Sequence, residues 1–148
     1  MEQLQFLPFD KSMLQECVDL YQQVFSKEPW FDCDERSDVE SYFINFYNLN
    51  KFAGYVLKRD DKIIALSLGF LKPWIKGEEY YIDQFCVDYS CQGKGIGSFL
   101  LNSIKNDLAQ KNIHAMMLNT EKDYPSYQFY IKNGFLCFQD IRVLGCEF

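Results

Sequence analysis

The spacing of hydrophobic residues along the chain alternates between the period of two typical of strands and the longer period typical of helices. Strand-like runs cover residues 4–9, 52–58, 63–71, 80–87, 115–119, 135–139 and 141–146. Helical spacing covers residues 14–25, 38–47, 96–112 and 125–133. The predicted order is therefore β-α-α-β-β-β-α-β-α-β-β. This is an α/β arrangement, and 148 residues are enough for a single domain, 1–148, with its own core.

The run from Tyr80 to Val87 is apolar at both alternating sets of positions, which is typical of a central strand buried on both faces. Asp83 is the acid in its middle. The strand leads into a loop with three glycines, made of Gln92, Gly93, Lys94, Gly95, Ile96 and Gly97, and an amphipathic helix follows. Unpaired N–H groups and the positive end of the dipole make a helix N-terminus attractive to anions. The pattern therefore predicts a phosphate or pyrophosphate site.

Two well-known phosphate motifs fit this loop poorly. A P-loop requires Gly-Lys-Ser/Thr at its end, but no Lys stands between Gly97 and Ser98. A dinucleotide fingerprint requires Gly-x-Gly-x-x-Gly, and here the third glycine comes one residue early. A strand-to-helix turn with no ligand is a further alternative.

The spacing Gln-x-x-Gly-x-Gly resembles the acetyl-CoA motif of the GNAT superfamily of N-acetyltransferases. Residues 129–135, Phe-Tyr-Ile-Lys-Asn-Gly-Phe, resemble that family's segment Leu-Tyr-Glu-Lys-Leu-Gly-Phe, and Val87-Asp88 resembles its Val-Asp-Pro strand end. Both motifs stand in the family's order, and the clear resemblance covers residues 79–139. It implies a GNAT-type mixed, mostly antiparallel sheet flanked by helices, and transfer of acetyl from acetyl-CoA to an amine.

The resemblance also implies where acetyl-CoA binds. The pyrophosphate would contact the backbone N–H groups of Gln92 to Gly97, and the pantetheine arm would enter a gap between the central strand and its neighbour. Phe85, Cys86 and Val87 would line one side of the gap and Asn119 the other. Asp123 stands where the family often has an Asn that bonds the CoA arm. It either contacts CoA or caps the following helix.

Direct attack by a neutral amine on the thioester is the family's usual route, and it requires no metal. By resemblance, Tyr130 donates a proton to the departing sulfur and the Val87 N–H binds the thioester oxygen. The general base remains open. Asp83 is the first candidate, because it shares the predicted strand face of Phe85 and Val87, and burial there would raise its pKa. Glu79 is the second and Glu121 is less favoured, and a chain of waters is a further alternative.

The acceptor site is expected where the first two helices are connected. Trp30 and Phe31 stand there beside the acids Asp32, Asp34 and Glu35. Aromatic faces and carboxylates together favour a cationic amine. We therefore assign Trp30, Phe31 and Asp83 to acceptor binding. The alternative is that Trp30 seals the core and the acids are solvated.

Composition disfavours several classes of function. The net charge of −6 disfavours nucleic acid and is compatible with a cationic amine. No apolar run is long enough to cross a membrane, and no signal peptide is recognisable, so a cytoplasmic location is expected. The six cysteines form no Cys-x-x-Cys pair, and His114 is the only histidine, which disfavours a zinc site and favours free thiols.

Three functions remain open from the sequence. The first is a small-molecule amine N-acetyltransferase, the second a protein or peptide N-acetyltransferase, and the third a non-catalytic CoA-binding module. The apolar residues of the two last predicted strands could pair or pack across a homodimer, which is common in the family.

Overall fold

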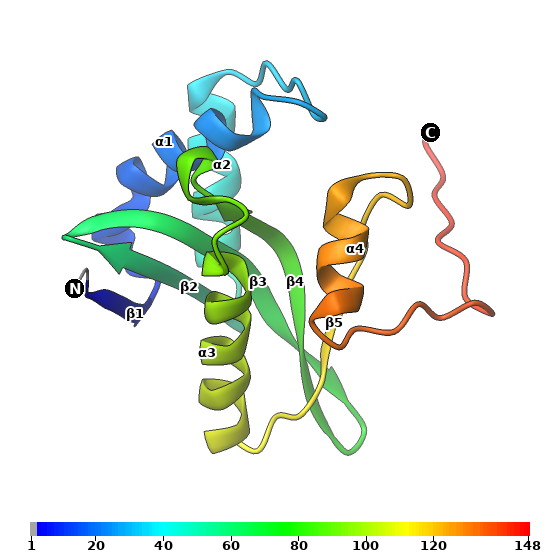
Figure 1. Ribbon diagram of the computed structural model, residues 1–148. Coiled ribbons are helices and arrows are strands. Elements are labelled where there is room, and N and C mark those ends of the chain that lie inside the picture. The colour runs from blue at the N-terminus through cyan, green and yellow to red at the C-terminus, as the bar shows by residue number, and fades with distance from the viewer. Residues whose placement is uncertain (1–2) are drawn as a thin grey trace.

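The computed structural model describes residues 3–148. Its centre is a sheet with the strand order β1-β2-β3-β4-β5, in which the first four strands are antiparallel and β5 runs parallel to β4 (Figure 1). The strands are β1 (Leu4–Pro8), β2 (Phe52–Arg59), β3 (Lys62–Trp74), β4 (Gly77–Val87) and β5 (Met116–Leu118). The predicted fold class, a mixed and mostly antiparallel α/β sheet, is confirmed.

The helices form two layers, one on each face of the sheet. One layer holds α1 (Leu14–Phe25) and α2 (Arg36–Tyr47), and the other holds α3 (Ile96–Gln110) and α4 (Pro125–Lys132) (Figure 1). Two short 3-10 turns, η1 (Lys11–Met13) and η2 (Tyr89–Cys91), precede α1 and α3. Each layer buries its own apolar cluster, and β4 contributes to both, with Tyr80 and Ile82 beside α3 and Cys86 beside α1 and α2.

A β-bulge interrupts β4 at its middle. Leu68 pairs with Gln84 but Gly69 pairs with Ile82, so Asp83 is the extra residue. A side chain at Gly69 would place its Cβ 2.0 Å from the Tyr81 carbonyl oxygen, so the bulge requires a glycine there. Because a bulge adds one residue, the side-chain alternation reverses across it. Ile82 before the bulge and Phe85 after it consequently pack on the same face of the sheet.

The two parallel strands separate just beyond this point. β5 pairs with β4 only from Tyr80 opposite Met116 to Ile82 opposite Leu118. Residues 83–87 of β4 therefore have a strand neighbour, β3, on one side only. This separation lies in front of the N-terminus of α3, and it is the arrangement that the resemblance implied for a pantetheine arm.

The predicted strands at 135–139 and 141–146 are wrong for this chain. Residues 135–148 contain a turn at 139–140 and no strand, and they run past α4 away from the sheet (Figure 1). Alternating hydrophobic residues indicate that a segment can form a strand, but a strand also needs a partner edge for its N–H and C=O groups. Within the single chain this segment pairs with no such edge. Among residues 3–148, no helix combines the length and the apolar character that crossing a membrane requires.

Candidate active site

The glycine loop connects β4 to α3 and leaves its backbone accessible. Gly93 and Gly95 have positive φ values of 73° and 80°, and a Cβ at either would have open space within 4 Å. Gly95 is the N-cap of α3, and because it has no side chain it cannot cap the first-turn N–H groups. Gln92, Lys94 and both glycines are exposed. The backbone at Gly93 and Gly95 is therefore accessible to an anion, whereas the Gln92 N–H already donates to the Tyr89 carbonyl oxygen at 3.4 Å.

The last glycine of the motif has a different role. A Cβ on Gly97 would lie 2.9 Å from the Phe129 ring of α4 and 3.5 Å from a methyl group of Val87. Glycine here allows α3 to approach α4 and the end of β4 closely. Ile96, beside it, is buried in the apolar cluster between α3 and the sheet. These two residues fix the helix against the sheet, and the Ile96 side chain points into the core.

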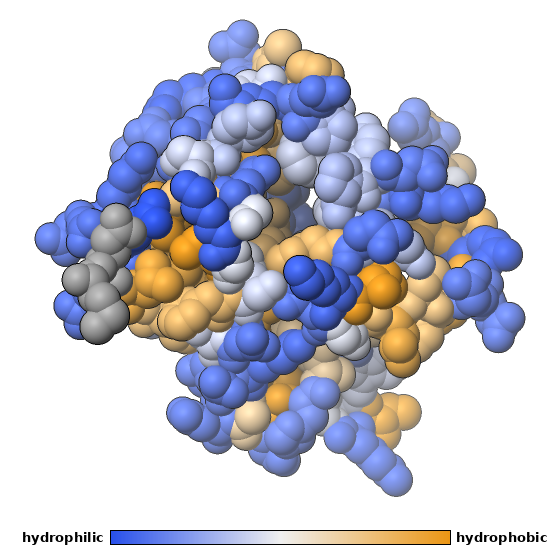
Figure 2. All heavy atoms as spheres, viewed as in Figure 1, coloured by the Kyte–Doolittle hydropathy of each residue, from blue (hydrophilic) through white to orange (hydrophobic). Residues whose placement is uncertain are grey.

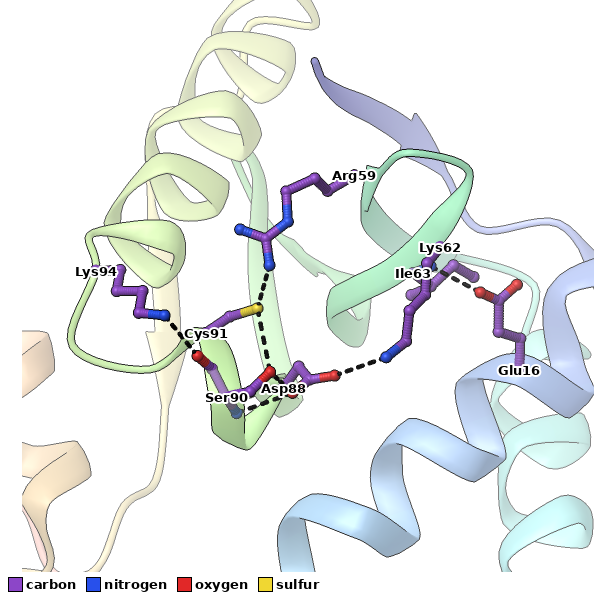
Figure 3. A network of polar contacts seen from close by, with 8 residues as sticks. All are labelled: Glu16, Arg59, Lys62, Ile63, Asp88, Ser90, Cys91 and Lys94. Carbon is purple, nitrogen blue, oxygen red and sulfur yellow. Dashed lines mark hydrogen bonds and ion pairs between the residues drawn. The ribbon is translucent and has the colours of Figure 1, made fainter. Parts of the chain in front are cut away.

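A polar network behind the loop holds it in place (Figure 3). Asp88 is buried at the end of β4, and its carboxylate accepts hydrogen bonds from the Ser90 N–H at 2.9 Å and the Ser90 hydroxyl at 2.7 Å. It also forms an ion pair of 3.3 Å with the Lys62 ammonium. Burial works to raise the pKa of Asp88, but the bonds from Ser90 and Lys62 hold it below the ordinary value. The carboxylate is thus ionised and fixes the first turn of the loop.

Three further contacts tighten the same loop. The Arg59 guanidinium donates to the buried Cys91 thiol at 2.7 Å, and the Lys94 ammonium donates to the Ser90 carbonyl oxygen at 2.9 Å (Figure 3). The Gln92 amide donates to the Val87 carbonyl oxygen at 3.0 Å. The side chains of Gln92 and Lys94 therefore bond to the loop and strand themselves, and the exposed N–H groups are left for a ligand.

The open edge of β4 directs backbone groups toward the separation from β5. Asp88 donates its N–H to Ile64 of β3, and successive residues of a strand point their N–H groups to opposite sides. The N–H groups of Val87 and Phe85 therefore point away from β3. The Cys86 thiol lies on the opposite face, buried among residues of α1 and α2, which removes the predicted contact of its side chain with the arm.

The predicted residues beyond β5 lie near this edge at the surface. Asn119 directly follows β5, and both Asn119 and Asp123 are exposed. The N-cap of α4 is Tyr124, whose side chain makes no capping hydrogen bond, and the side-chain contact of the first turn is between the hydroxyls of Ser126 and Thr120 at 2.8 Å. Asp123 therefore does not cap α4. In the space-filling view the surface is recessed between the side of the glycine loop and α4 (Figure 2).

Tyr130 of α4 is buried in the apolar cluster between α3 and the sheet, next to residues 83–87 of β4, which do not pair with β5. Its ring lies 6.1 Å from Phe85, 5.1 Å from Phe129 and 5.2 Å from Phe135, measured between ring centres. Burial, with a smaller contribution from Cys86, raises the pKa of Tyr130 above its ordinary value. The hydroxyl carries its proton at neutral pH and can act as a hydrogen-bond donor.

The structure corrects the predicted surroundings of Asp83. It was expected to be buried on the face of Phe85 and Val87, but it is exposed, and the bulge turns it toward α2 on the other face. There its carboxylate accepts a hydrogen bond from the Tyr42 hydroxyl. Burial and this bond raise the pKa of Tyr42 above its ordinary value. The bulge thus brings an accessible carboxylate and a phenol from another element together.

Glu79 is not brought to the same place. It is buried near the β3–β4 hairpin, opposite Lys72, whose ammonium lies 4.0 Å from its carboxylate. Four strand positions separate it from Asp83, which corresponds to about 13 Å along β4. Glu79 therefore has the contacts of a structural ion pair.

The loop between α1 and α2 approaches the N-terminus of α4. The Trp30 ring packs edge-on at 5.0 Å against Phe25 of α1 and at 6.1 Å against Tyr124, which precedes α4. Phe31 is 65% exposed and has a positive φ of 48°. Trp30 thus bridges the two sides of the site, while Phe31 presents its ring to solvent.

Beside this loop is a pocket of about 280 Å³, lined by Tyr21, Gln22, Phe25, Ser26, Asp32, Cys33 and Asp34. Burial and the charges of Asp34 and Asp32 raise the pKa of Tyr21 to about 12, and the Asp83 charge adds to this. The Tyr21 and Tyr42 rings lie 6.3 Å apart. Asp32 and Asp34 line the pocket together with Tyr21, and Asp83 is bonded to the neighbouring Tyr42, so negative charge on this side of the molecule favours a cation. No cluster of metal-ligating side chains is found within residues 3–148.

The sequence profile of the Acetyltransferase (GNAT) family matches residues 14–135. This chain belongs to the GNAT acetyltransferase family. The match includes the bulged strand, the glycine loop and Tyr130. Among curated proteins, none has a sequence significantly similar to this GNAT chain.

Solved structures share the fold at low sequence identity. The aminoglycoside N-acetyltransferase AAC(6')-Iy in complex with CoA has a TM-score of 0.77 at 14% identity, covering 99% of this chain and 95% of that one. The aminoglycoside acetyltransferase meta-AAC0020 from an uncultured soil metagenomic sample, in complex with sisomicin, has a TM-score of 0.76 at 16% identity, covering 98% of this chain and 96% of that one. A GNAT family acetyltransferase from Staphylococcus aureus has a TM-score of 0.75 at 18% identity, covering 99% of this chain and 100% of that one.

Two parts of this GNAT site were not predicted from the sequence. Tyr21 and Tyr42 occupy helix positions whose spacing is typical of core residues. The residues around Tyr42 in the sequence do not indicate that it contacts Asp83. A signal for the bulge does exist, because Gly69 is an isolated glycine inside the strand-like run 63–71. Combined with the acid at position 83, it could have indicated that Asp83 changes face.

Proposed function

We propose that this GNAT protein transfers the acetyl group of acetyl-CoA to the amine of a small cationic molecule. The observation that supports this best is that β4 carries parts of both sites. Its end leads into the glycine loop with its exposed backbone, and its bulge carries Asp83, whose charge acts on Tyr21 together with those of Asp32 and Asp34. Solved complexes of proteins with this fold contain CoA in one case and the aminoglycoside sisomicin in another.

In the proposed reaction the N–H groups of Gly93 to Gly97 bind the pyrophosphate of acetyl-CoA. The N–H groups of Phe85 and Val87, which point away from β3, bind the arm and the thioester oxygen. Both glycines with positive φ leave the space that such a close approach requires.

Chemistry then requires an amine without its proton. Asp83 accepts a proton from the bound ammonium, and Tyr42 orients its carboxylate. Asp83 passes this first proton to solvent. The amine nitrogen then forms a bond to the thioester carbon, the tetrahedral intermediate loses its extra N–H proton to the Asp83 carboxylate, and the carbon–sulfur bond breaks. Tyr130 donates its proton to the departing thiolate and recovers one from solvent, a role for which a hydroxyl that stays protonated is suited.

The test is release of CoA thiol with a panel of monoamines, diamines and larger polycationic amines, compared with short peptides bearing a free N-terminus or lysine. The fastest turnover is expected with small molecules carrying two or more ammonium groups. Asp32→Asn with Asp34→Asn should raise KM about ten-fold with little change in kcat, because these carboxylates bind the part of the acceptor that does not react. Tyr130→Phe should instead lower kcat about 100-fold.

Other outcomes would favour the remaining functions. Turnover only with peptides would indicate a protein or peptide N-acetyltransferase. Tight binding of acetyl-CoA with no turnover on any amine, and no effect of Tyr130→Phe, would indicate a CoA-binding module.

A further inference from the structure

Three aromatic rings form a closed group beside the part of β4 that does not pair with β5. They belong to Phe85 of β4 and to Phe129 and Tyr130 of α4, and we call them the aromatic wall. Each ring lies against the other two, with ring centres 5.7 Å, 6.1 Å and 5.1 Å apart. Tyr130 is buried, whereas Phe85 and Phe129 are half-buried. Because a ring packed between two others has little freedom to move aside, the aromatic wall is a rigid apolar surface.

The aromatic wall is supported from behind by the first turn of α3. A Cβ on Gly97 would lie 2.9 Å from the Phe129 ring, so this ring already lies directly against the backbone of α3. A methyl group of Val87 lies 3.5 Å from the same Cβ position and fills the remaining side. Phe129 is also larger than the Leu of the family's segment at this position. Phe129 therefore has no space to move back, and it holds Phe85 in place.

The separation between β4 and β5 has an open end and a closed end, and Phe85 lies between them. The glycine loop begins after Val87 at the open end, and Ile82 opposite Leu118 is the closed end. An acyl-CoA whose pyrophosphate is bound by the loop therefore extends from the open end toward the closed end. With the thioester oxygen on the Val87 N–H, the acyl group points toward Phe85, which is two strand positions or about 7 Å away.

We propose that Phe85, held by Phe129 and Tyr130, is a specificity-determining residue that rejects acyl-CoA thioesters with an acyl chain longer than acetyl. The acetyl methyl group fits in front of the Phe85 ring, and each further methylene of a propionyl or butyryl group meets the ring. One methylene is discriminated by about 10- to 200-fold in a well-packed apolar site. The inference rests on the proposed function, because it takes the position of the thioester from it.

Steady-state kinetics with acetyl-CoA, propionyl-CoA and butyryl-CoA test the proposal. In the unmodified protein, kcat/KM should fall about ten-fold or more with each added methylene. Phe85→Val removes the ring but keeps the backbone N–H and a side chain that is common in strands. Butyryl-CoA should then come within about three-fold of acetyl-CoA. Phe129→Leu removes only the support of the Phe85 ring, so it should raise the relative rate with butyryl-CoA less, about three- to ten-fold.

Phe135→Leu is the matched control for these variants. The Phe135 ring also packs on Tyr130, at 5.2 Å, but within residues 3–148 the ring contacts of Phe85 are those with Phe129 and Tyr130. The acyl selectivity of Phe135→Leu should therefore stay within about two-fold of the unmodified protein. The proposal is wrong if Phe135→Leu relaxes the selectivity as much as Phe85→Val does, because loosened packing around Tyr130 would then be the cause.

Titration calorimetry separates this inference from the proposed function, because binding requires neither an acceptor nor turnover. Acetyl-CoA should bind the unmodified protein about ten-fold or more tightly than butyryl-CoA, and Phe85→Val should remove most of the difference. If binding discriminates in this way but no amine is acetylated, the inference stands and the proposed function is wrong. If acetyl is transferred but neither affinity nor kcat/KM distinguishes the acyl groups, the proposed function stands and the inference is wrong.

Discussion

The two halves of the proposed site are built in different ways. The proposed CoA half is made of consecutive residues, from β4 through the glycine loop into α3, and offers backbone N–H groups. The proposed acceptor half joins α1, α2, their connecting loop and the bulge of β4, and it offers side chains such as Tyr42 and Asp83. A local backbone motif can be recognised from the chain itself. A site assembled from distant side chains depends on packing that no short stretch encodes.

The largest effect is expected from Gly95→Glu, which attacks the backbone-built half. Gly95 has a φ of 80°, and the left-handed conformation costs another residue about 1–2 kcal/mol. The new carboxylate would also repel the pyrophosphate at the helix N-terminus. Acetyl-CoA affinity, measured by titration calorimetry, should fall about 100-fold or more. The matched control is Gly77→Glu, which has a positive φ of 144° and open space at the hairpin. If both variants lose CoA equally, strain in the fold and not the loop is responsible.

The next largest effect should be confined to the acceptor half. Asp83→Asn removes the carboxylate at the bulge while keeping its size, so kcat should fall about 100-fold. Acetyl-CoA affinity should stay within about two-fold, since Asp83 lies on the face opposite Phe85 and Val87. Steady-state kinetics and calorimetry on the same preparation separate these effects. Glu79→Gln is the comparison. A larger loss of kcat in this variant than in Asp83→Asn would reverse the assignment of the base.

These two carboxylates also indicate how far sequence reasoning reaches. The central strand, the glycine loop, the two following helices and the fold class were all predictable, because each depends on local spacing. The sheet face on which the Asp83 side chain lies was not predictable, because the bulge inserts one residue and reverses the alternation from which that face was inferred. The prediction of strands at residues 135–139 and 141–146 was wrong for another reason. Alternation predicts a strand-forming segment, and it does not say whether a partner edge exists within the same chain.

A smaller effect is expected from the support behind the glycine loop. Asp88→Asn keeps the side chain's size but removes the charge that Ser90 and Lys62 stabilise. The first turn of the loop should loosen, and acetyl-CoA affinity should fall about three- to ten-fold without loss of the fold. Lys62→Ala, which removes only the exposed partner, should have a smaller effect. An equal loss in both variants would indicate that the ion pair, and not the bonds from Ser90, holds the loop.

The smallest effect concerns alkaline stability and compares one tyrosine from each half. Burial raises the pKa of Tyr130 in the CoA half, and burial together with Asp83 raises the pKa of Tyr42 in the acceptor half. The unfolded chain releases phenol protons near pH 10, while the folded chain retains them. Each group therefore stabilises the fold fully below that pH, and the contribution is lost as pH rises further. The free energy of unfolding should decline above about pH 10, by up to about 1.4 kcal/mol per pH unit for each such group.

Tyr130→Phe and Tyr42→Phe should each make the decline of the unfolding free energy with pH less steep by the contribution of one titrating phenol. Urea unfolding between about pH 9 and pH 11 measures this slope. The two reductions should add in the double variant, because the residues lie on opposite faces of the sheet. An unchanged slope in Tyr130→Phe would mean that its hydroxyl titrates in the folded protein as freely as in the unfolded chain. Tyr130 would then be more accessible to solvent than its packing against Phe85, Phe129 and Phe135 indicates.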